Sequence, residues 1–388
     1  MEVITLQGHS VVRPRDVAAS LALVFVWMLA SAAIAKPTPI ETPTGQRFHL
    51  MTFVSPGNTH ESRGVVWLDN QQLIFIGGGS ARNPGGPDAG VFIWDTVPNR
   101  VVRYGKETRF CYASGTIYLA ENRKYDTSNE QTTWTYRYGS FGREKTEVCN
   151  ATTGNDYQNC IARLNMSCKA VHSGRSRDRD IPFGSESRLL FDLREDDGML
   201  VVARRWSDTK QKLTREEIVA LSHQSILLVN KQYPKGKELP IQDVEGIESR
   251  SAAYSEYAKK YTFVGWTPKG SQPGRQTNWP EKRPQPVYLM DKNGNVEIVE
   301  IPKSEEWSGI FMAMPSREGL VFGGGHGRTG GGLYVYNGKQ VEAIDRGRVG
   351  TFSVSPNGCK VAYSIVNQYG QGDNEFVIKF VNLCNQGK

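Results

Sequence analysis

The sequence predicts an all-β protein with a β-propeller fold, and three observations support this fold class. Short apolar runs recur in pairs, separated by turns rich in Asp, Asn, Pro and Gly, which is the pattern of β-hairpins. One phrase occurs twice, as Leu73–Gly79 and Leu320–Gly325, and recurrence of a unit indicates a repeat architecture. The chain also holds 40 glycines and 10% aromatic residues, a composition that suits many short strands joined by tight turns.

Residues 1–35 have the features of an export signal. Arg13 and Arg15 precede a nearly continuous apolar run, Val17–Leu29, and Ala33–Ala35 has the small residues of a cleavage site. The alternative is a membrane anchor that stays attached, but the run is shorter than the about 20 residues that a span needs. We therefore expect cleavage, a single propeller domain over residues 36–388 with no further membrane span, and a periplasmic or secreted protein.

The apolar runs form two kinds of hairpin. The first kind comprises Val65–Leu68 with Leu73–Ile76, Leu189–Leu193 with Met199–Ala203, Ile310–Met314 with Leu320–Phe322, and Thr351–Val354 with Cys359–Ser364. The second kind comprises Val91–Asp95 with Val101–Tyr104, Val287–Met290 with Val296–Ile301, and Leu333–Tyr336 with Gln340–Ile344. A long loop separates the two kinds, so each unit has four antiparallel strands, which is the content of a propeller blade.

Counting these units gives six blades, and the irregular region around the second blade leaves seven open as an alternative. The expected bounds are 64–104, 109–148, 187–242, 250–302, 308–345 and 347–384. The last blade has three clear strands, and we expect an N-terminal strand at Arg47–Phe53 to supply the fourth, because such closure removes open sheet edges. A polar insertion that contains cysteines is expected after blade 2, at about 141–183, and a capping box predicts a short helix over Thr214–Leu221.

All six cysteines lie beyond the signal segment, and an even number in an exported chain indicates disulfides. Cys359 and Cys384 stand apart from the others, and we expect them to pair. The pairing of the remaining four is left open: Cys111, Cys149, Cys160 and Cys168. No C-x-x-C pair occurs, so neither a zinc ribbon nor a thioredoxin-type redox site is supported.

The segment Ser355–Ser364 reads Ser-Pro-Asn-Gly-Cys-Lys-Val-Ala-Tyr-Ser. It resembles the S-P-D-G-x-x-[VI]-A-[FY] phrase of the WD40-like propeller repeats found in TolB-type periplasmic proteins, with Asn357 in place of the usual Asp. The resemblance covers one blade. It implies a propeller, usually six-bladed in that group, and a periplasmic location, and it does not carry the partners of TolB to this chain.

The long loops are the expected ligand-binding region. In a blade of this strand order, the connection from the second to the third strand and the connection to the next blade emerge at the same end, and long loops on a rigid scaffold usually carry binding sites. These loops contain the cations Arg82, Arg123, Lys124, Arg205, Lys269, Arg275, Lys282, Arg283 and Arg328, together with Trp206, Trp266 and Trp279. Because arginine pairs with carboxylate or phosphate and tryptophan offers a flat face to sugars, the expected ligand-binding residues are Arg82, Trp266, Arg275, His326 and Arg328.

The sequence offers no convincing catalytic set, and we expect no metal and no cofactor. No H-E-x-x-H motif occurs, no G-x-S-x-G elbow follows the signal segment, and Gly323–Gly332 lacks the Gly-Lys-Ser/Thr of a phosphate loop. The net charge of +7 either favours anionic partners or serves solubility alone. We therefore predict a binding or scaffolding module for an envelope protein or an anionic glycan in a bacterial envelope, with no specific nucleic-acid partner. The alternative is a propeller enzyme, a hydrolase or lyase acting on a glycan or lactone, with His326 as the best single acid–base candidate.

Overall fold

The computed structural model of the protein describes most of the residues between Thr38 and Cys384, which form one of the two compact units of the chain. The described residues are 38–42, 65–78, 90–107, 109–113, 115–120, 124–126, 128, 131–151, 188–193, 197–205, 223–241, 252–265, 284–302, 304, 307, 309–326, 330–366 and 377–384. Within this part of the chain the secondary structure is almost entirely strand. None of its helices has the length and apolar character needed to cross a bilayer.

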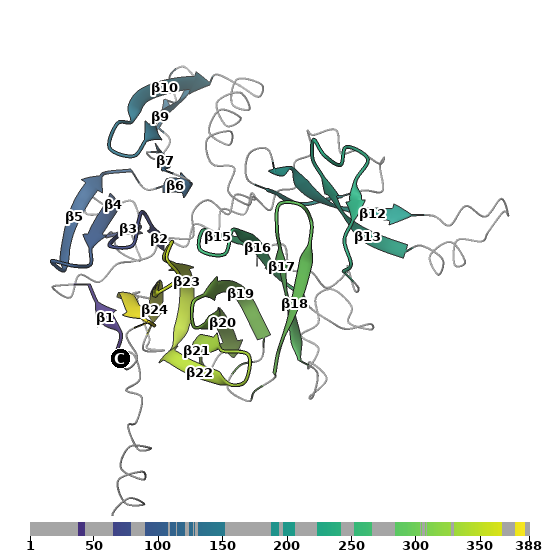
Figure 1. Ribbon diagram of the computed structural model, residues 1–388. Coiled ribbons are helices and arrows are strands. Elements are labelled where there is room, and N and C mark those ends of the chain that lie inside the picture. The colour runs from purple at the N-terminus through teal and green to yellow at the C-terminus, as the bar shows by residue number, and fades with distance from the viewer. Residues whose placement is uncertain are drawn as a thin grey trace, which may run out of the picture. The chain divides into compact units, whose positions relative to one another are not determined.

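The described strands form six antiparallel sheets, which we call blades 1 to 6 in chain order (Figure 1). Blade 1 contains β2 (Val65–Trp67), β3 (Gln72–Gly77), β4 (Gly90–Asp95) and β5 (Arg100–Gly105). Blade 2 contains β6 (Arg109–Ala113), β7 (Thr116–Ala120), β9 (Gln131–Ser140) and β10 (Lys145–Ala151), and β8 (Lys124–Asp126) pairs with β9. Blade 3 contains β11 (Arg188–Asp192), β12 (Met199–Arg205), β13 (His223–Val229) and β14 (Lys237–Glu238).

The second half of the chain repeats the same arrangement. Blade 4 contains β15 (Ala253–Ser255), β16 (Lys260–Val264), β17 (Gln285–Met290) and β18 (Val296–Ile301). Blade 5 contains β19 (Gly309–Ser316), β20 (Gly319–His326), β21 (Gly330–Tyr336) and β22 (Val341–Arg346). Blade 6 contains β23 (Arg348–Val354), β24 (Lys360–Val366), β25 (Val377–Asn382) and β1 (Ile40–Glu41). The sheets therefore agree with the predicted propeller and closely with the predicted blade bounds.

Blade 6 is completed by an N-terminal strand, as predicted, but the segment differs. Ile40 of β1 pairs with Phe380 of β25, and Glu41 pairs with Lys379. The prediction placed this strand at Arg47–Phe53, which lies outside the described residues, and the position is wrong because Ile40–Glu41 occupies the outer edge of β25. A strand of two residues has no alternation that a sequence pattern could reveal.

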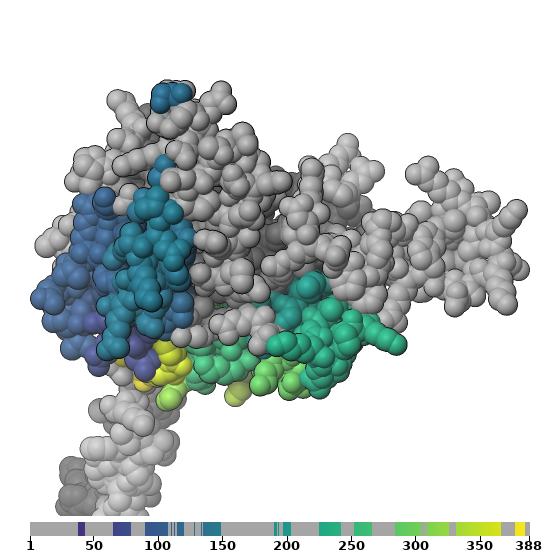
Figure 2. All heavy atoms as spheres, turned by 90° about the horizontal axis from the view of Figure 1, so that it is seen from above, coloured from purple at the N-terminus to yellow at the C-terminus, as the bar shows by residue number. Residues whose placement is uncertain are grey.

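Apolar side chains join consecutive blades from blade 3 through blades 4, 5, 6 and 1 to blade 2. The rings of Phe191 and Phe263 lie 5.4 Å apart between blades 3 and 4, and those of Trp94 and Phe380 lie 5.1 Å apart between blades 1 and 6. Blades 1 and 2 share a cluster that includes Ile93 and Phe110, and they lie side by side, in blue shades, in Figure 2. Face-to-face packing of sheets through their apolar sides is what a propeller requires.

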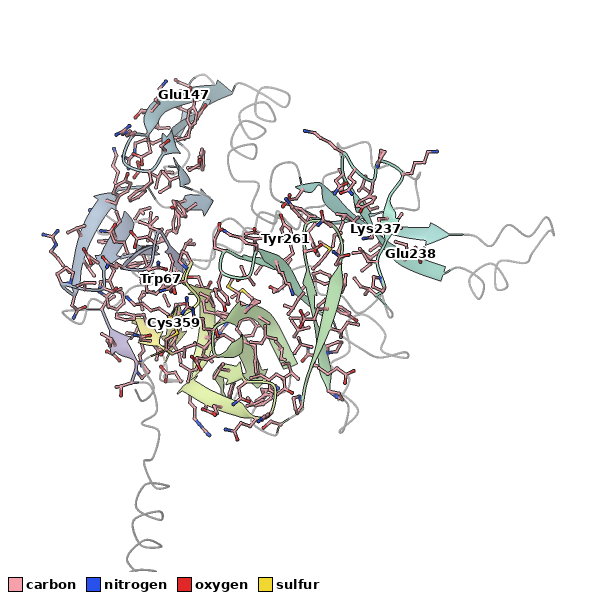
Figure 3. The ribbon with its side chains drawn as sticks, viewed as in Figure 1. Trp67, Glu147, Lys237, Glu238, Tyr261 and Cys359 are labelled. Carbon is pink, nitrogen blue, oxygen red and sulfur yellow. A yellow bond between two sulfur atoms is a disulfide. The ribbon has the colours of Figure 1, made fainter. Side chains whose placement is uncertain are left out.

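Buried polar groups at the joints find partners across the blades. Thr262 of blade 4 donates to the carbonyl of Ala313 in blade 5 at 2.6 Å. Tyr261 of the same strand donates to Asp197 of blade 3 at 2.6 Å, and Trp67 of blade 1 donates to the carbonyl of Ser353 in blade 6 at 3.1 Å (Figure 3 labels Tyr261 and Trp67). Satisfying such groups avoids the cost of desolvating them without a partner.

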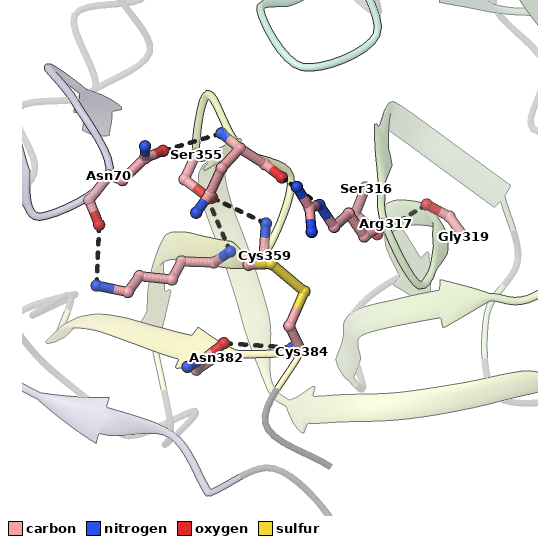
Figure 4. Close-up of a disulfide and its surroundings, with 10 residues drawn as sticks. Asn70, Ser316, Arg317, Gly319, Ser355, Cys359, Asn382 and Cys384 are labelled. Carbon is pink, nitrogen blue, oxygen red and sulfur yellow. Dashed lines mark hydrogen bonds between the residues drawn. A yellow bond between two sulfur atoms is a disulfide. The ribbon is translucent and has the colours of Figure 1, made fainter. Parts of the chain in front are cut away.

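The turn within the Ser355–Ser364 segment is held from both sides (Figure 4). The hydroxyl of Ser355 accepts a hydrogen bond from the backbone N–H of Lys360, at 2.8 Å. The side chain of Asn70 in blade 1 accepts a hydrogen bond from the Asn357 N–H at 2.9 Å, and Arg317 of blade 5 donates to the Asn357 carbonyl at 2.9 Å. The turn chemistry read from the sequence therefore also joins three neighbouring blades.

The disulfide between Cys359 and Cys384 is present, which confirms the predicted pair. Cys111 lies in β6 and Cys149 lies in β10. The side chains of Cys111 and Cys149 lie outside the described part of the chain, and so do Cys160 and Cys168. The predicted helix over Thr214–Leu221 also lies outside it. The pairing of these four cysteines therefore stays open.

The predicted start of the insertion after blade 2 is wrong. Residues 145–151 form β10, which pairs along its whole length with β9. The expected insertion at about 141–183 therefore begins with part of the blade. The expected blade 2 already reached residue 148, but the rest of β10 carries no apolar alternation, since Val148 is its one large apolar residue. Glu147 of β10 accepts hydrogen bonds from Tyr136 and Tyr138 of β9 at 2.7 and 2.6 Å.

Candidate ligand-binding site

Each blade has two ends, which the strand order defines. The first strand begins and the second strand ends at what we call the loop end, and the hairpin turns lie at the turn end. Arg82 follows Gly77, Trp266 and Arg275 follow Val264, and Arg328 follows His326. These four residues lie outside the described part, and the flanking strands place them in the second-to-third-strand connections of blades 1, 4 and 5.

The connection in blade 5 is much shorter than predicted. The sequence suggested a loop over 323–332, but β20 runs to His326 and β21 starts at Gly330, so that only residues 327–329 connect them. His326 is the last residue of β20 and pairs with Gly330, while its side chain lies outside the described part. Glycines form strands here because neighbouring aromatic rings occupy the space that side chains would need.

The glycines of blade 5 form a row across the loop end of the sheet. Gly325 of β20 pairs with Gly309 of β19 on one side and with Gly331 of β21 on the other. The N–H of Gly347, the residue between β22 and β23, donates to the carbonyl of Gly331 at 3.1 Å. We call Gly309, Gly325, Gly331 and Gly347 the glycine shelf, because backbone without side chains crosses this end of the blade.

Packing explains most of the neighbouring glycines but not Gly325. A Cβ at Gly323 would collide with the ring of Phe311, one at Gly324 would lie 2.8 Å from the Cβ of Trp307, and one at Gly332 would lie 2.6 Å from the carbonyl oxygen of Asp345. At Gly325 the nearest atom recorded around such a Cβ is the carbonyl oxygen of Gly309, at 4.0 Å. The described residues therefore leave the space above Gly325 open.

Arginines begin three of the first strands at the loop end. They are Arg109 in β6, Arg188 in β11 and Arg348 in β23. The side chain of Arg348 is exposed and makes no hydrogen bond or ion pair with the described part of the protein. An arginine without a carboxylate partner retains its full capacity to bind a carboxylate or phosphate from outside.

The first strands of three blades are bulged at the same position. The register shifts around Leu190 in β11, Phe311 in β19 and Gly350 in β23, in each case the third residue of the strand. Bulges redirect side chains and are frequent at rims and next to binding sites. This geometry recurs at the loop end and was not visible in the sequence, where these strands look regular.

The carboxylates described near the joints are engaged by the protein itself. Asp345 of β22 accepts hydrogen bonds from Tyr363 at 2.8 Å and from Lys379 at 3.1 Å. Burial, together with Asp345, raises the pKa of Tyr363, which keeps its hydroxyl protonated as a donor. Within the described residues, no group of three or more His, Cys, Asp or Glu side chains could hold a metal ion.

A second internal charge cluster lies between blades 1 and 2. Arg137 of β9 forms an ion pair with Glu107 at 2.6 Å and lies 3.7 Å from Glu144, and both carboxylates are almost fully buried. Tyr104 donates to Glu144 at 2.5 Å, and its ring stacks on Phe141 at 5.1 Å. Burial and the hydrogen bond to Glu144 raise the pKa of Tyr104 to about 12.

This pKa predicts an alkaline loss of stability that depends on Tyr104. Its pKa in the folded protein lies above the ordinary value of 10.0, so the stabilisation is fully present below pH 10 and is lost as the pH rises through about 12. The difference in unfolding free energy between the wild type and the variant Tyr104→Phe should shrink over this range, measured by urea unfolding at a series of pH values. A difference that stays constant would show that the phenol does not titrate in this environment.

The sequence identified the loop ends as the region of interest but missed the residues that the structure describes best. Arg348 and the glycine shelf were not singled out, although the segment Arg346–Arg348 places a glycine between two arginines directly after an apolar strand. Such a short connection between blades leaves both arginines at the rim. Of the five predicted residues, His326 ends β20, and the other four lie outside the described part of the chain. By chain order, Arg328 follows His326, Trp266 and Arg275 belong to the same connection of blade 4, and Arg82 belongs to blade 1.

Comparisons with known proteins yield structural likenesses only. No protein-family model matches the chain, and no curated protein matches it. The β-propeller domain of the trilobed protease from Pyrococcus furiosus is 11% identical, with 85% of this chain and 99% of that chain covered and a TM-score of 0.45. The acylaminoacyl peptidase of Pyrococcus horikoshii is 11% identical over 79% of this chain and 44% of that chain, with a TM-score of 0.29. Hydrazine synthase of Kuenenia stuttgartiensis is 11% identical over 88% and 97%, with a TM-score of 0.33. The fold assignment rests on the six sheets themselves, and by these the protein is a β-propeller.

Proposed function

We propose that this protein is an exported β-propeller that binds an anionic ligand, an acidic glycan of the bacterial envelope, at the loop ends of its blades. The observation that carries the proposal is the loop end of blade 5. There the glycine shelf lies beside an exposed Arg348 that has no partner in the described structure, while nearby Asp345 is already engaged by Tyr363 and Lys379. The end of the blade thus offers an exposed positive charge to a ligand.

Charge in the connecting loops supports the same assignment. Arg82, Arg275 and Arg328 belong to the second-to-third-strand connections of three different blades, and the whole chain has a net charge of +7. A cluster of one charge sign raises the local concentration of ligands of opposite charge and accelerates their association. An acidic envelope protein would bind the same arginines. If the glycan displaces such a protein, the two ligands share this site.

We also propose that the protein is located outside the cytoplasm. This location is supported by the export-signal pattern of residues 1–35 and by the disulfide Cys359–Cys384 in the folded unit, because such bonds persist in oxidising compartments. We also propose that the repeats are of the WD40-like, TolB-type class, since the turn at Ser355–Gly358 has the hydrogen bonds expected of its Ser-Pro-Asn-Gly sequence.

One variant removes three arginines from the loop ends of the blades, and a separate control variant removes three lysines from the turn ends. The variant Arg82→Ala/Arg275→Ala/Arg328→Ala should bind an oligogalacturonate at least about tenfold more weakly than the wild type, because each arginine can form charge-assisted hydrogen bonds. Isothermal titration calorimetry at two salt concentrations measures the loss. The affinity of the wild type itself should fall as salt is added.

A matched control separates position from net charge. Lys235, Lys292 and Lys339 are exposed and lie in turns between third and fourth strands, at the turn end. The variant Lys235→Ala/Lys292→Ala/Lys339→Ala loses the same charge and should bind like the wild type. Equal losses in both variants would assign binding to net charge alone and reject a site at the loop ends. Conversion of the oligosaccharide during the titration would instead favour the enzyme reading.

A further inference from the structure

We propose that the turn end of the propeller carries a second binding site, which takes a carboxylate side chain of a partner protein. The site is centred on Arg317 and Tyr257, two exposed residues from the turns of blades 5 and 4. It lies at the opposite end of the blades from the proposed glycan site. The inference goes beyond the proposed function, because one propeller with both sites holds a glycan and a protein at the same time.

The turns between first and second strands of four blades meet at the Ser-Pro-Asn-Gly turn of blade 6. The N–H of Asn357 donates to the side chain of Asn70 in blade 1 at 2.9 Å. The N–H of Arg317 in blade 5 donates to the carbonyl of Gly358 at 3.0 Å. A Cβ on Gly358 would lie 2.6 Å from the ring of Tyr257 in blade 4, so this ring covers the glycine. We call Asn70, Tyr257, Arg317 and Asn357 the turn-end patch, and Figure 4 shows Asn70 and Arg317 on either side of the turn.

The guanidinium of Arg317 is held in place and has donors to spare. Its Nε donates to the carbonyl of Asn357 at 2.9 Å, which leaves the N–H groups of both Nη atoms for another acceptor. Arg317 is exposed and forms no ion pair with the residues that the structure describes. A guanidinium that is oriented in advance can hold a carboxylate with two charge-assisted hydrogen bonds at a small cost in entropy.

Tyr257 supplies an aromatic surface at the same turn. Its ring lies on Gly358, yet the residue is 37% exposed, and its hydroxyl makes no hydrogen bond within the described ranges. Tyrosine and arginine, together with tryptophan, are the residues that contribute most to the affinity of protein interfaces. A ring and a guanidinium that both contact the segment Asn357–Gly358 therefore favour a protein as the partner.

The turn that carries the patch is rigid before any partner binds. Cys359, the residue after Gly358, forms the disulfide with Cys384. Within the turn, the hydroxyl of Ser355 accepts a hydrogen bond from the N–H of Lys360 at 2.8 Å. A site that is already ordered avoids the free-energy cost of ordering side chains and loops on binding.

Most other charges at these turns are engaged within the protein. Lys259 forms an ion pair with Glu256 at 2.9 Å, and Lys360 donates to a backbone carbonyl of blade 1 at 2.9 Å. Glu318, the residue after Arg317, is exposed and has no cation partner among the described residues. Its charge opposes the binding of a carboxylate nearby, so that its removal should strengthen binding.

A copolymer of glutamate and tyrosine is the probe, because it presents carboxylates and aromatic rings on a polypeptide. In fluorescence anisotropy, Arg317→Gln should bind it at least about tenfold more weakly than the wild type, and Tyr257→Ala about fivefold more weakly. Glu318→Gln should bind it more tightly. Arg143→Gln is the matched control, since Arg143 is exposed in a turn between third and fourth strands, outside the patch, and it should bind like the wild type.

The outcomes separate this site from the proposed function. A wild type that does not bind the copolymer, or equal losses in Arg317→Gln and Arg143→Gln, would overturn the inference. Oligogalacturonate binding should be unchanged in Arg317→Gln, and its loss would show that the turn end takes the glycan instead of a protein. A wild type that binds the copolymer but not oligogalacturonate rejects the proposed function and leaves this site standing.

A second variant covers the case in which Arg317→Gln lowers the melting temperature. Tyr257→Ala then decides, because the side chain of Tyr257 contributes a ring contact but no hydrogen bond to the described turn. If this variant keeps the melting temperature and binds the copolymer as tightly as the wild type, the turn-end patch is rejected.

Discussion

Replacing Lys379 with methionine should lower the unfolding free energy by about 3 kcal/mol, because it leaves the carboxylate of Asp345, which is only 17% exposed, without its cation. The side chain of Lys379 is 9% exposed, and its Nζ lies 3.1 Å from Asp345 and 3.3 Å from Glu41. Methionine fills most of the space of the lysine, so the loss reports the charge more than the packing. Urea unfolding followed by tryptophan fluorescence measures the change.

An exposed ion pair provides the control for this experiment. Lys260 lies 2.7 Å from Glu297, but the two side chains are 33% and 57% exposed. Lys260→Met should therefore change the unfolding free energy by no more than about 0.5 kcal/mol. Combining Lys379→Met with Asp345→Asn should recover part of the loss, since the unpaired charge is then gone. A loss for Lys379→Met as small as that for Lys260→Met would contradict the assigned role of the buried pair.

Removing the disulfide with Cys359→Ser and Cys384→Ser should cost about 3 kcal/mol, since the bond closes a loop between residues 25 apart. The bond ties Cys359, the residue before β24, to Cys384 in the segment after β25, in the blade that β1 completes. Serine retains the backbone hydrogen bonds of the turn at Asn357 and Asn382. The double variant should unfold at a lower urea concentration than the oxidised wild type, and it isolates this bond from any other disulfide in the chain. Coincident unfolding curves would contradict the prediction.

The sequence predicted the hairpins well because the residues that determine a hairpin lie within its own two strands and turn. Val287–Met290 and Val296–Ile301 were expected as a hairpin, and they correspond to β17 and β18. The turn between them is encoded by Asp291, whose carboxylate accepts hydrogen bonds from the backbone N–H groups of Asn293 and Asn295 at 2.8 and 2.9 Å. Turn residues and apolar alternation together therefore fix both strands without knowledge of the rest of the chain.

Features that depend on distant partners were not predictable in this way. Strand β1 is defined by pairing with β25, and Glu41 interacts with Lys379. In blade 5, Gly323 and Gly324 looked like loop residues, and they form a strand because the rings of Phe311 and Trp307 cover them. The segment Arg346–Arg348 marks an arginine-rich connection in the sequence. That Arg348 has no side-chain partner among the described residues is recognised only when its surroundings are known.

The division of blade 6 between β1 and β25 imposes an order of assembly. Synthesis delivers Ile40–Glu41 long before Val377–Asn382, so the first strand must wait unpaired while the strands of five sheets and part of the sixth are made. During that interval β1 has no partner strand and could pair with the open edge of another sheet. This sheet can therefore be completed only after the chain has been made as far as β25.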